Sequence, residues 1–375
     1  MPNTTSWVEI NSSALTENID SFRNLIGSGV ALMAVVKADA YGHGLVNVAK
    51  VAVASGVTWL GVNNLEEALR LRREGVLLPI LILGMVRPES LVEAVENDIS
   101  LTVYNHEILE ALGNIDTLSK IHLKIETGTG RQGIFPEEIP TYMETLSRYH
   151  QITLEGLSTH FANLEDANEL TYAIHQLQCF QKVGERVRGK IGRYPIRHSA
   201  CTAAVFSLPS SMLDLVRIGI GMYGLWPSPS LKALAQDKFP ELRLQPALAW
   251  KTVVAQVKRF PKGAKIGYGC SYETSRDSMI AVLPVGYYDG YDRRLSPNGR
   301  VLVGGKGASV VGRICMNMMM IDVTDISDVC VESEVVLLGK QGDGEIPAEE
   351  LAERIGTINY EVVSRINPLL PRIYV

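Results

Sequence analysis

The chain has 375 residues, of which 46% are hydrophobic and 21% are charged, and its formal net charge at pH 7 is -5. This composition supplies enough apolar material for a large core and excludes disorder or a long coiled coil as the main state. No Lys/Arg-rich block indicates a nucleic-acid partner. The longest apolar run, Val76–Val86, is interrupted by Pro79 and is far shorter than the roughly 20 residues of a membrane-spanning helix. We therefore expect neither a nucleic-acid nor a membrane partner.

Two features favour a cytoplasmic location. The N-terminal residues lack the basic and apolar regions of a secretory signal. The cysteines are odd in number and form no CxxC pair, which is typical of a protein that keeps its thiols reduced. They lie at Cys179, Cys201, Cys270, Cys315 and Cys330.

The first part of the chain alternates between short apolar runs and amphipathic stretches. A strand over Trp7–Ile10 and a helix that places Leu15, Ile19 and Phe22 on one side come first. Eight apolar runs follow: Leu32–Val36, Trp59–Val62, Ile80–Leu83, Leu101–Tyr104, Ile121–Ile125, Ile152–Leu157, Ile196–His198 and Leu213–Ile218. This alternation predicts an α/β fold with an N-terminal (β/α)8 TIM-type barrel. A doubly wound sheet shares the alternation, but no GxGxxG follows the first strand.

After Pro240 strand patterns dominate, and helical periodicity returns only at Ala348–Ile355. The predicted strands are Trp250–Val257, Met279–Leu283, Val301–Val303, Ser309–Val311, Met318–Val323 and Glu334–Leu338. We expect a barrel domain over 1–238 and a mainly β C-terminal domain over 239–375. The early strand is not needed for the barrel, so residues 1–10 are free to pair with the C-terminal domain.

Charged side chains gather where the predicted barrel strands end, which is where barrel enzymes carry their sites. They are Lys37, Lys124, Arg131, His160, His198 and Arg217. Such a pocket suits a phosphate or carboxylate, and a buried lysine among cations can lose its proton and form a Schiff base. A lysine beside a phosphate site suggests pyridoxal phosphate (PLP). The residues at the strand ends do not by themselves indicate which reaction the cofactor would serve.

The segment Ala34-Val-Val-Lys37-Ala-Asp-Ala-Tyr41-Gly-His-Gly44 closely resembles the PLP-lysine signature of bacterial alanine racemases. Further blocks resemble that family in the same order along both domains. They include Lys124-x-x-Thr127-Gly-x-Gly-Arg131, Thr159-His160-Phe161, Arg217-x-Gly219-x-x-Met222, Gly267-Tyr268-Gly269, Gly312-Arg313-Ile-Cys-Met316 and Asn359-Tyr360-Glu361.

The resemblance implies two catalytic residues. Lys37 would hold PLP as a Schiff base and act as one acid/base group, and Tyr268 of the partner subunit would act as the other. Racemisation of an amino acid bound to PLP as an external aldimine needs one base on each face of the α-carbon. The resemblance therefore also implies a homodimer with shared active sites, a small amino-acid substrate, and D-alanine made for peptidoglycan.

The remaining roles are implied in the same way. Arg217 would face the pyridine nitrogen, with His160 between it and the catalytic tyrosine. The phosphate would be held by Tyr41, Thr202, Gly219, Ile220 and Tyr360. Arg131 and Met316 would bind the substrate carboxylate, and Lys124 matches a lysine that is often carbamylated in the family. Tyr287, Arg293 and Arg313 resemble residues of the entry corridor, and no metal site is expected.

Some positions depart from the family pattern, namely Glu126 for aspartate, Cys201-Thr202 for Asn-Ser, and Asn317 for aspartate. These differences bear on the range of substrates, so broad-specificity, serine and lysine racemases stay open beside alanine. A PLP-dependent decarboxylase is disfavoured by Arg217, because an acidic partner of the pyridine nitrogen is expected there. A non-catalytic PLP carrier is disfavoured by Tyr268 and the second domain.

Overall fold

The computed structural model describes residues 4–166 and 168–375, which fall into two compact units. The barrel unit comprises residues 14–40 and 45–245. The β unit comprises residues 4–13, 41–44 and 246–375. The division at 238/239 stays a prediction, and in the described chain the later part of the β unit starts at Pro246.

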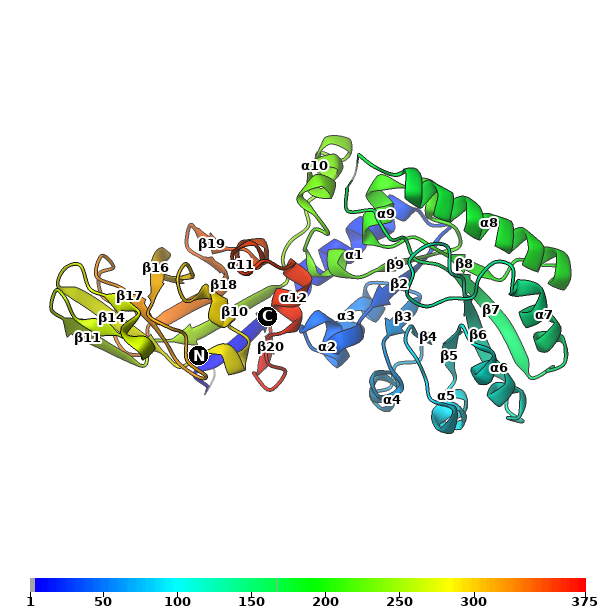
Figure 1. Cartoon of the computed structure of the whole chain (residues 1–375), viewed down its shortest axis with the longest axis horizontal. Coiled ribbons are helices and arrows are strands. Elements are labelled where there is room, and N and C mark those ends of the chain that lie inside the picture. The colour runs from blue at the N-terminus through cyan, green and yellow to red at the C-terminus, as the bar shows by residue number, and fades with distance from the viewer. Residues whose placement is uncertain (1–3, 167) are drawn as a thin grey trace. The chain divides into compact units, whose positions relative to one another are not determined.

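The strands of the barrel unit form one parallel sheet in the order β8-β7-β6-β5-β4-β3-β2-β9 (Figure 1). Their bounds are β2 Ala31–Val35, β3 Trp59–Val62, β4 Ile80–Ile82, β5 Ile99–Val103, β6 Ser119–Lys124, β7 Ile152–Ser158, β8 Ile196–His198 and β9 Leu215–Ile218. Between β8 and β9, Arg217 donates its backbone N–H to Ala200, and Cys201 forms a bridge with Arg217. These contacts close the ring, so the predicted TIM-type barrel is confirmed.

The helices of the barrel unit follow the strands and lie outside them (Figure 1). They are α1 Ser12–Ile26, α3 Leu45–Ala54, α4 Leu65–Arg73, α5 Leu91–Glu96, α6 His106–Gly113, α7 Ile139–Ser147, α8 Thr171–Ile191, α9 Thr202–Ser207 and α10 Pro229–Lys238. The 3-10 helices are η1 Pro88–Ser90, η2 Pro209–Ser211 and η3 Ile220–Tyr223, and a short turn, α2 Lys37–Tyr41, crosses into the β unit. The helices α4 and α6 begin at asparagine caps, because Asn64 and Asn105 accept the N–H groups of Glu67 and Ile108.

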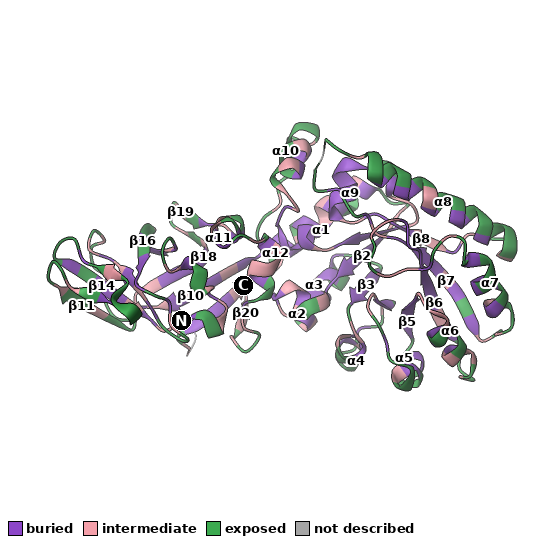
Figure 2. Ribbon diagram, in the orientation of Figure 1, coloured by how far each residue is buried: buried purple, intermediate pink, exposed green. Residues whose placement is uncertain are grey.

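Burial explains why these segments form barrel strands. The strands β3 and β5 are buried along their whole length (Figure 2). Parallel strands covered on both faces show continuous apolar runs rather than alternation. The helices bury one stripe each; Leu15, Ile19 and Phe22 of α1 are at most 2% exposed.

The β unit is built on a largely antiparallel sheet in the order β11-β14-β17-β16-β15-β18-β10-β1-β20, with β19 paired to β18. Its strands are β1 Ser6–Ile10, β10 Leu248–Val253, β11 Gln256–Phe260, β12 Lys265–Ile266, β13 Tyr272–Glu273, β14 Ser278–Leu283, β15 Arg300–Val303, β16 Lys306–Val311, β17 Met319–Asp322, β18 Glu334–Gln341, β19 Gly344–Ile346 and β20 Arg372–Tyr374. The helices are α11 Ala348–Ile355, α12 Asn359–Ser364 and the 3-10 turns η4 Tyr268–Cys270, η5 Tyr287–Asp289 and η6 Arg293–Leu295. The predicted mainly β domain is confirmed.

The N-terminal strand belongs to this sheet. The strand β1 runs antiparallel to β10, with Val8 opposite Trp250, and parallel to β20, with Val8 opposite Arg372. Trp7 is 1% exposed and Val8 is fully buried, so the strand is part of the core of the β unit.

One predicted strand is wrong in its extent. The run Trp250–Val257 is two strands, because the backbone leaves β10 at Val254 and donates there to Ser333. The strand β10 pairs with β18, whereas β11 pairs with β14. A continuous strand-like pattern in the sequence does not reveal where the hydrogen-bonding partner changes. None of the helices in the described part of the chain is long and apolar enough to cross a membrane.

Candidate active site

Lys37 follows the barrel strand β2 and opens a left-handed turn. Ala38, Asp39, Ala40 and Tyr41 all have φ between 51° and 56°. This conformation costs an L-residue roughly 1 kcal/mol or more each, so the surrounding structure must hold it. Two hydrogen bonds of Asp39 hold the turn in place. Its Oδ1 accepts the N–H of Leu45 at 2.9 Å, and its own N–H donates to Glu67 Oε1 at 3.3 Å.

The barrel mouth is electropositive. Burial lowers the pKa of Lys37, and Arg131 lowers it further, while Glu67 acts in the opposite direction. Burial, then Arg217 and Arg131, hold the pKa of Lys124 well below its usual value. The two amines therefore reach the neutral, nucleophilic state more readily than a solvated lysine does.

Arg217 of β9 is 6% exposed, and its guanidinium is held on one side by four hydrogen bonds. Nη1 donates to His198 Nδ1 and to the His198 carbonyl, both at 2.7 Å. Nη2 donates to the carbonyls of Thr159 at 2.8 Å and Ser199 at 3.1 Å, and lies 3.4 Å from His160 Nδ1. Burial lowers the pKa of Arg217 to about 10, so the group stays charged at neutral pH. A guanidinium has five N–H groups, and these four bonds use those of Nη1 and Nη2. The Nε–H is the fifth donor.

His160 lies beside this arginine. Burial, followed by the charges of Arg217 and Lys124, holds the pKa of His160 well below its usual value. The imidazole is therefore neutral at pH 7 and can both accept and donate a hydrogen bond.

Arg131 is carried by a loop that folds around the Glu126 carboxylate. Oε1 accepts the N–H groups of Gly128 at 2.5 Å and Thr129 at 2.6 Å, and Oε2 accepts that of Arg131 at 3.2 Å. Burial alone would raise the pKa of Glu126, but these backbone donors bring it below its usual value. The longer side chain at this departure from the family pattern thus organises the loop.

Thr202 is 4% exposed and links the start of α9 to the turn after β9. Its Oγ1 accepts the N–H of Gly219 at 3.2 Å and that of Gly221 at 3.5 Å. Ile220 begins η3, where the first N–H groups of a helix lack intrahelical acceptors. The structure thus brings Thr202, Gly219 and Ile220 together, with the Gly219 N–H directed at Thr202.

In the β unit, two predicted phosphate ligands lie together. The rings of Tyr41 and Tyr360 have centroids 6.2 Å apart and are tilted by 50°. Gly42 beside them has no room for a side chain, because a Cβ there would lie 2.3 Å from the Val363 carbonyl oxygen. This close approach, and the hydrogen bonds of Arg372 to the Gly42 carbonyl at 3.1 Å, hold residues 41–44 in the β unit.

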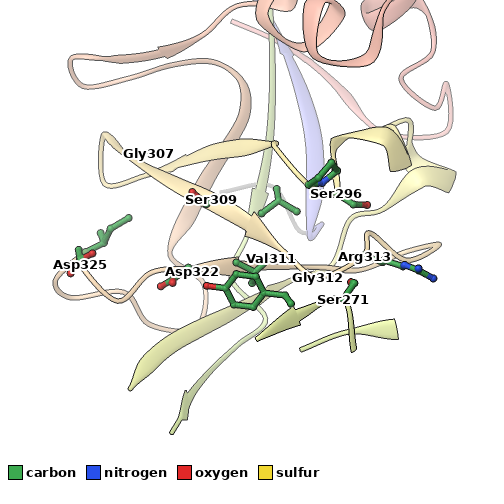
Figure 3. Close-up of a pocket in the computed structure, with 13 residues that line it drawn as sticks. Ser271, Ser296, Gly307, Ser309, Val311, Gly312, Arg313, Asp322 and Asp325 are labelled. Carbon is green, nitrogen blue, oxygen red and sulfur yellow. The ribbon is translucent and has the colours of Figure 1, made fainter. Parts of the chain in front are cut away.

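Tyr268 is 72% exposed and begins η4, between Gly267 and Gly269. An added Cβ on Gly269 would lie 3.1 Å from Nη1 of Arg313, so the Tyr268 turn and Arg313 are neighbours. Arg313 also lines a cavity of about 680 Å³ in the β unit, together with Ser271, Ser309 and Asp322 (Figure 3).

Tyr287 and Met316 form a second exposed pair. The N–H of Tyr287 donates to the Cys315 carbonyl at 3.0 Å, and that of Tyr288 to the Met316 carbonyl at 2.9 Å. Tyr287 is 42% exposed and Met316 is 55% exposed. Arg293, at the start of η6, is also exposed, and in the described part of the chain no hydrogen bond or ion pair joins its side chain to Tyr287 or Arg313, so the entry corridor stays a prediction.

Two residues with contacts to this site were missed in the sequence. His122 lies between Ile121 and Leu123 in β6 and bonds to His198, and Glu155 in β7 bonds to His122. The available signal was a titratable residue among the apolar residues of a predicted strand. Its meaning depends on which strand lies next to it, and that is a tertiary property.

A parallel barrel with a lysine and two arginines at its strand ends, joined to a mainly β unit, has the architecture of a two-domain barrel enzyme, and such enzymes carry their sites at these strand ends. Models of the alanine racemase N-terminal domain match residues 10–227, and models of the C-terminal domain match residues 247–374. An alanine racemase of Desulforamulus reducens is 41% identical over 374 residues, covering 98% of each chain. The chain belongs to the alanine racemase family.

Solved structures agree with this assignment. The alanine racemase of Bacillus anthracis with bound L-Ala-P has a TM-score of 0.93 at 37% identity, covering 100% of this chain and 96% of that one. A histidine racemase of Leuconostoc mesenteroides has a TM-score of 0.87 at 29% identity, covering 100% and 99%. The same fold thus serves relatives named for different amino acids.

Proposed function

We propose that this protein interconverts L-alanine and D-alanine with PLP as cofactor. The observation that carries the proposal is the Lys37 amine at the end of β2, whose pKa is lowered by burial and by Arg131. Such an amine is suited to bond covalently to an aldehyde cofactor and to exchange protons near neutral pH. Membership of the alanine racemase family supports the choice of reaction and substrate.

The residues present fit PLP. The cofactor is anionic, and Arg131 and Arg217 supply positive charge around the barrel mouth. Lys37 would hold the aldehyde carbon. Arg217 would offer its remaining Nε–H to the pyridine nitrogen. The phosphate would be bound by the hydroxyls of Tyr41, Thr202 and Tyr360 and by the backbone at Gly219 and Ile220, and the Gly219 N–H would be shared with Thr202 Oγ1.

When bound, PLP withdraws electrons from the substrate α-carbon and makes its proton removable. Arg217 presents an N–H rather than a carboxylate, and it stays protonated, so it shares no proton with the ring. This partner would limit the electron withdrawal and would favour simple proton exchange over transamination and decarboxylation.

Two side chains would move the α-proton. Lys37 Nζ would act on one face of the α-carbon, and the hydroxyl of the partner's Tyr268 on the other. A phenol has an ordinary pKa of about 10, so its proton transfer needs a hydrogen-bonding neighbour. His160, neutral and adjacent to Arg217, is the side chain that we assign to this role.

The substrate carboxylate would be bound by Arg131 and by Met316 of the partner subunit, after passing Tyr287, Arg293 and Arg313. The lowered pKa of Lys124 supports a carbamate at this position, because only a neutral amine adds to carbon dioxide, releasing one proton. That carbamate would be an anion between Arg131 and Arg217, whose charges lower the pKa of the amine.

We also propose a homodimer in the cytoplasm of a bacterium, where D-alanine is used for peptidoglycan. The five cysteines, all in the described part of the chain, are free thiols, which supports a reducing compartment.

A panel assay tests the substrate. The protein is incubated with single L-amino acids, including alanine, serine, lysine and histidine, and the D-forms are measured by chiral chromatography. We expect D-alanine to form fastest. Faster racemisation of another amino acid would overturn the choice of alanine, and carbon dioxide release without D-product would indicate a decarboxylase.

Reductive trapping tests the cofactor site. Borohydride treatment of the holoenzyme, followed by peptide mapping, should find the pyridoxyl group on Lys37. Attachment to another lysine would contradict the assignment. Lys50, an exposed lysine paired with Glu74, serves as an internal control that should stay unmodified.

A further inference from the structure

A chain of hydrogen bonds crosses the barrel from Arg217 to the opposite side. His198 Nε2 lies 2.8 Å from His122 Nδ1, and His122 Nε2 lies 3.2 Å from Glu155 Oε2. The same Glu155 oxygen accepts the hydroxyl of Ser100 at 2.6 Å. His122 and His198 are fully buried, Ser100 is 2% exposed, and the Glu155 side chain is 20% exposed.

The two ends of this chain determine where each hydrogen lies. A guanidinium only donates, so His198 Nδ1 must accept and its hydrogen must be on Nε2. His198 Nε2 then donates to His122 Nδ1, which leaves the hydrogen of His122 on Nε2, facing Glu155. A carboxylate only accepts, so the far end demands the same order. The N–H groups of both histidine rings therefore point away from Arg217.

The ionisation of the groups agrees with this order. Burial lowers the pKa of both imidazoles, and Arg217 adds to the effect, so both rings are neutral. Burial alone would raise the pKa of Glu155, but the bonds from His122 and Ser100 bring it below its usual value. A charged His198 would place its Nδ1–H against the N–H of Arg217.

The rings have little freedom to turn. A Cβ on Gly156 would lie 2.1 Å from His122 Nδ1, so the His122 ring occupies the space that a side chain there would need. The Trp59 ring packs edge-on against His122 with the centroids 5.3 Å apart. Packing and hydrogen bonds therefore favour one arrangement of the chain.

We propose that Glu155, supported by Ser100, is a remote positioning residue that fixes the tautomers of His122 and His198 and thereby orients Arg217. With Nη1 held by His198, the Nε–H is the donor left for a ligand. The inference rests on the proposed function only in taking that ligand to be PLP. The histidine tautomers follow from the hydrogen bonds within the protein and do not depend on the cofactor.

Glu155→Gln tests the proposal, because an amide can donate as well as accept. If the amide donates to His122, the order of the chain reverses and His198 Nδ1–H faces Arg217. In wild-type holoenzyme with ¹⁵N-labelled histidine, NMR should show both Nδ1 atoms unprotonated. The variant should show a mixture of tautomers, a shifted absorbance of the bound cofactor, and kcat reduced by about tenfold with KM little changed. His122→Asn supplies the assignment of the resonances.

Asp214→Asn is the matched control. Asp214 is another partly buried carboxylate of the barrel, and it accepts from Arg197 N and Nε at 2.8 Å. Its loss should lower stability without changing the histidine tautomers or the absorbance. Ser100→Ala, which keeps the carboxylate, should change kcat in the same direction as Glu155→Gln but by less, and it guards against a variant that fails to fold.

The outcomes separate the two proposals. If Glu155→Gln lowers stability as Asp214→Asn does, and the tautomers and absorbance stay as in the wild type, the positioning role is overturned. If the tautomers respond as expected but no amino acid is racemised by the wild type, the hydrogen-bond chain stands and the proposed function fails.

Discussion

The barrel unit and the β unit carry their candidate residues in different ways. In the barrel, Lys124 is 9% exposed and Arg217 is 6% exposed, and Arg217 is fixed by four hydrogen bonds. In the β unit, Tyr268 is 72% exposed and Met316 is 55% exposed. One set is enclosed by its own unit, whereas the other is presented on a surface.

This difference has a physical meaning. Buried cations keep their positions and shifted pKa values only where packing and hydrogen bonds hold them. Clustered large side chains that stay exposed are typical of a surface that another molecule covers. The contrast supports the proposed dimer, in which each barrel supplies Lys37 and receives the partner's Tyr268.

Mixing two inactive variants is the strongest test of the comparison. Lys37→Ala and Tyr268→Phe should each reduce kcat by at least about 1,000-fold, because each removes one of the two bases. After co-expression, random pairing makes half of the dimers mixed, and each mixed dimer has one site without a lesion. Roughly a quarter of the wild-type activity should return by this symmetry argument.

The control is a tagged mixed dimer isolated by two affinity steps. Tyr288→Phe changes an exposed tyrosine next to Tyr287 in the sequence, and this variant should stay active by itself. An inactive mixed dimer of Lys37→Ala with Tyr268→Phe would mean that Tyr268 serves the site of its own chain.

Arg217→Lys tests the enclosed side of the comparison. Lysine keeps the positive charge but lacks the planar guanidinium, which makes four hydrogen bonds here and keeps its Nε–H for a ligand. We expect kcat to fall about 100- to 1,000-fold, which corresponds to roughly 3–4 kcal/mol of lost preorganisation. Arg197 lies on β8 and donates to Asp214 through Nε and Nη2, and Arg197→Lys should lower stability but leave kcat nearly unchanged. Equal effects of the two variants on kcat would remove the special role of Arg217.

Glu126→Gln tests the loop that carries Arg131. An amide oxygen replaces one carboxylate oxygen, but the NH2 group then faces a backbone N–H as donor against donor. We expect KM for alanine to rise about tenfold, since hydrogen bonds to charged groups contribute about 1.5–3 kcal/mol each. Glu138→Gln, which affects an exposed carboxylate that accepts Phe135 N–H at 2.9 Å, is the control and should leave KM unchanged. A KM like the wild type in Glu126→Gln would show that the loop holds Arg131 by other means.

The barrel could be predicted because its strands are short, largely apolar runs that alternate with amphipathic stretches, and each run lies close to the observed bounds. The early strand could be recognised as well, but its neighbours β10 and β20 could not, since they come from the far end of the chain. The division of Trp250–Val257 into two strands depends on a change of pairing partner. The short elements β12, β13 and α12 carry too few residues for a periodic pattern.

The candidate site shows the same limit. Lys37, Arg131 and Arg217 are visible in the sequence because they follow strands and lie in motifs. The bond between His122 and Glu155 is not visible, because it depends on the lateral contact of β6 with β7. The four left-handed residues after Lys37 include no glycine, so the sequence did not predict a left-handed turn there.

The strain near the two proposed catalytic residues offers the smallest and most local test. Ala38 is exposed with φ 56°, and Cys270, two residues after Tyr268, is exposed with φ 49°. Glycine adopts this conformation without the Cβ clash, so Ala38→Gly and Cys270→Gly should each raise the free energy of unfolding by about 0.5–1 kcal/mol. Ala233→Gly, in the exposed middle of the right-handed helix α10, should lower it by a similar amount. Urea unfolding measures all three, and kcat measured beside it should fall several-fold in Ala38→Gly, because glycine loosens the turn that follows Lys37. If Ala38→Gly destabilises the protein as Ala233→Gly does, the left-handed turn at Ala38 is not strained.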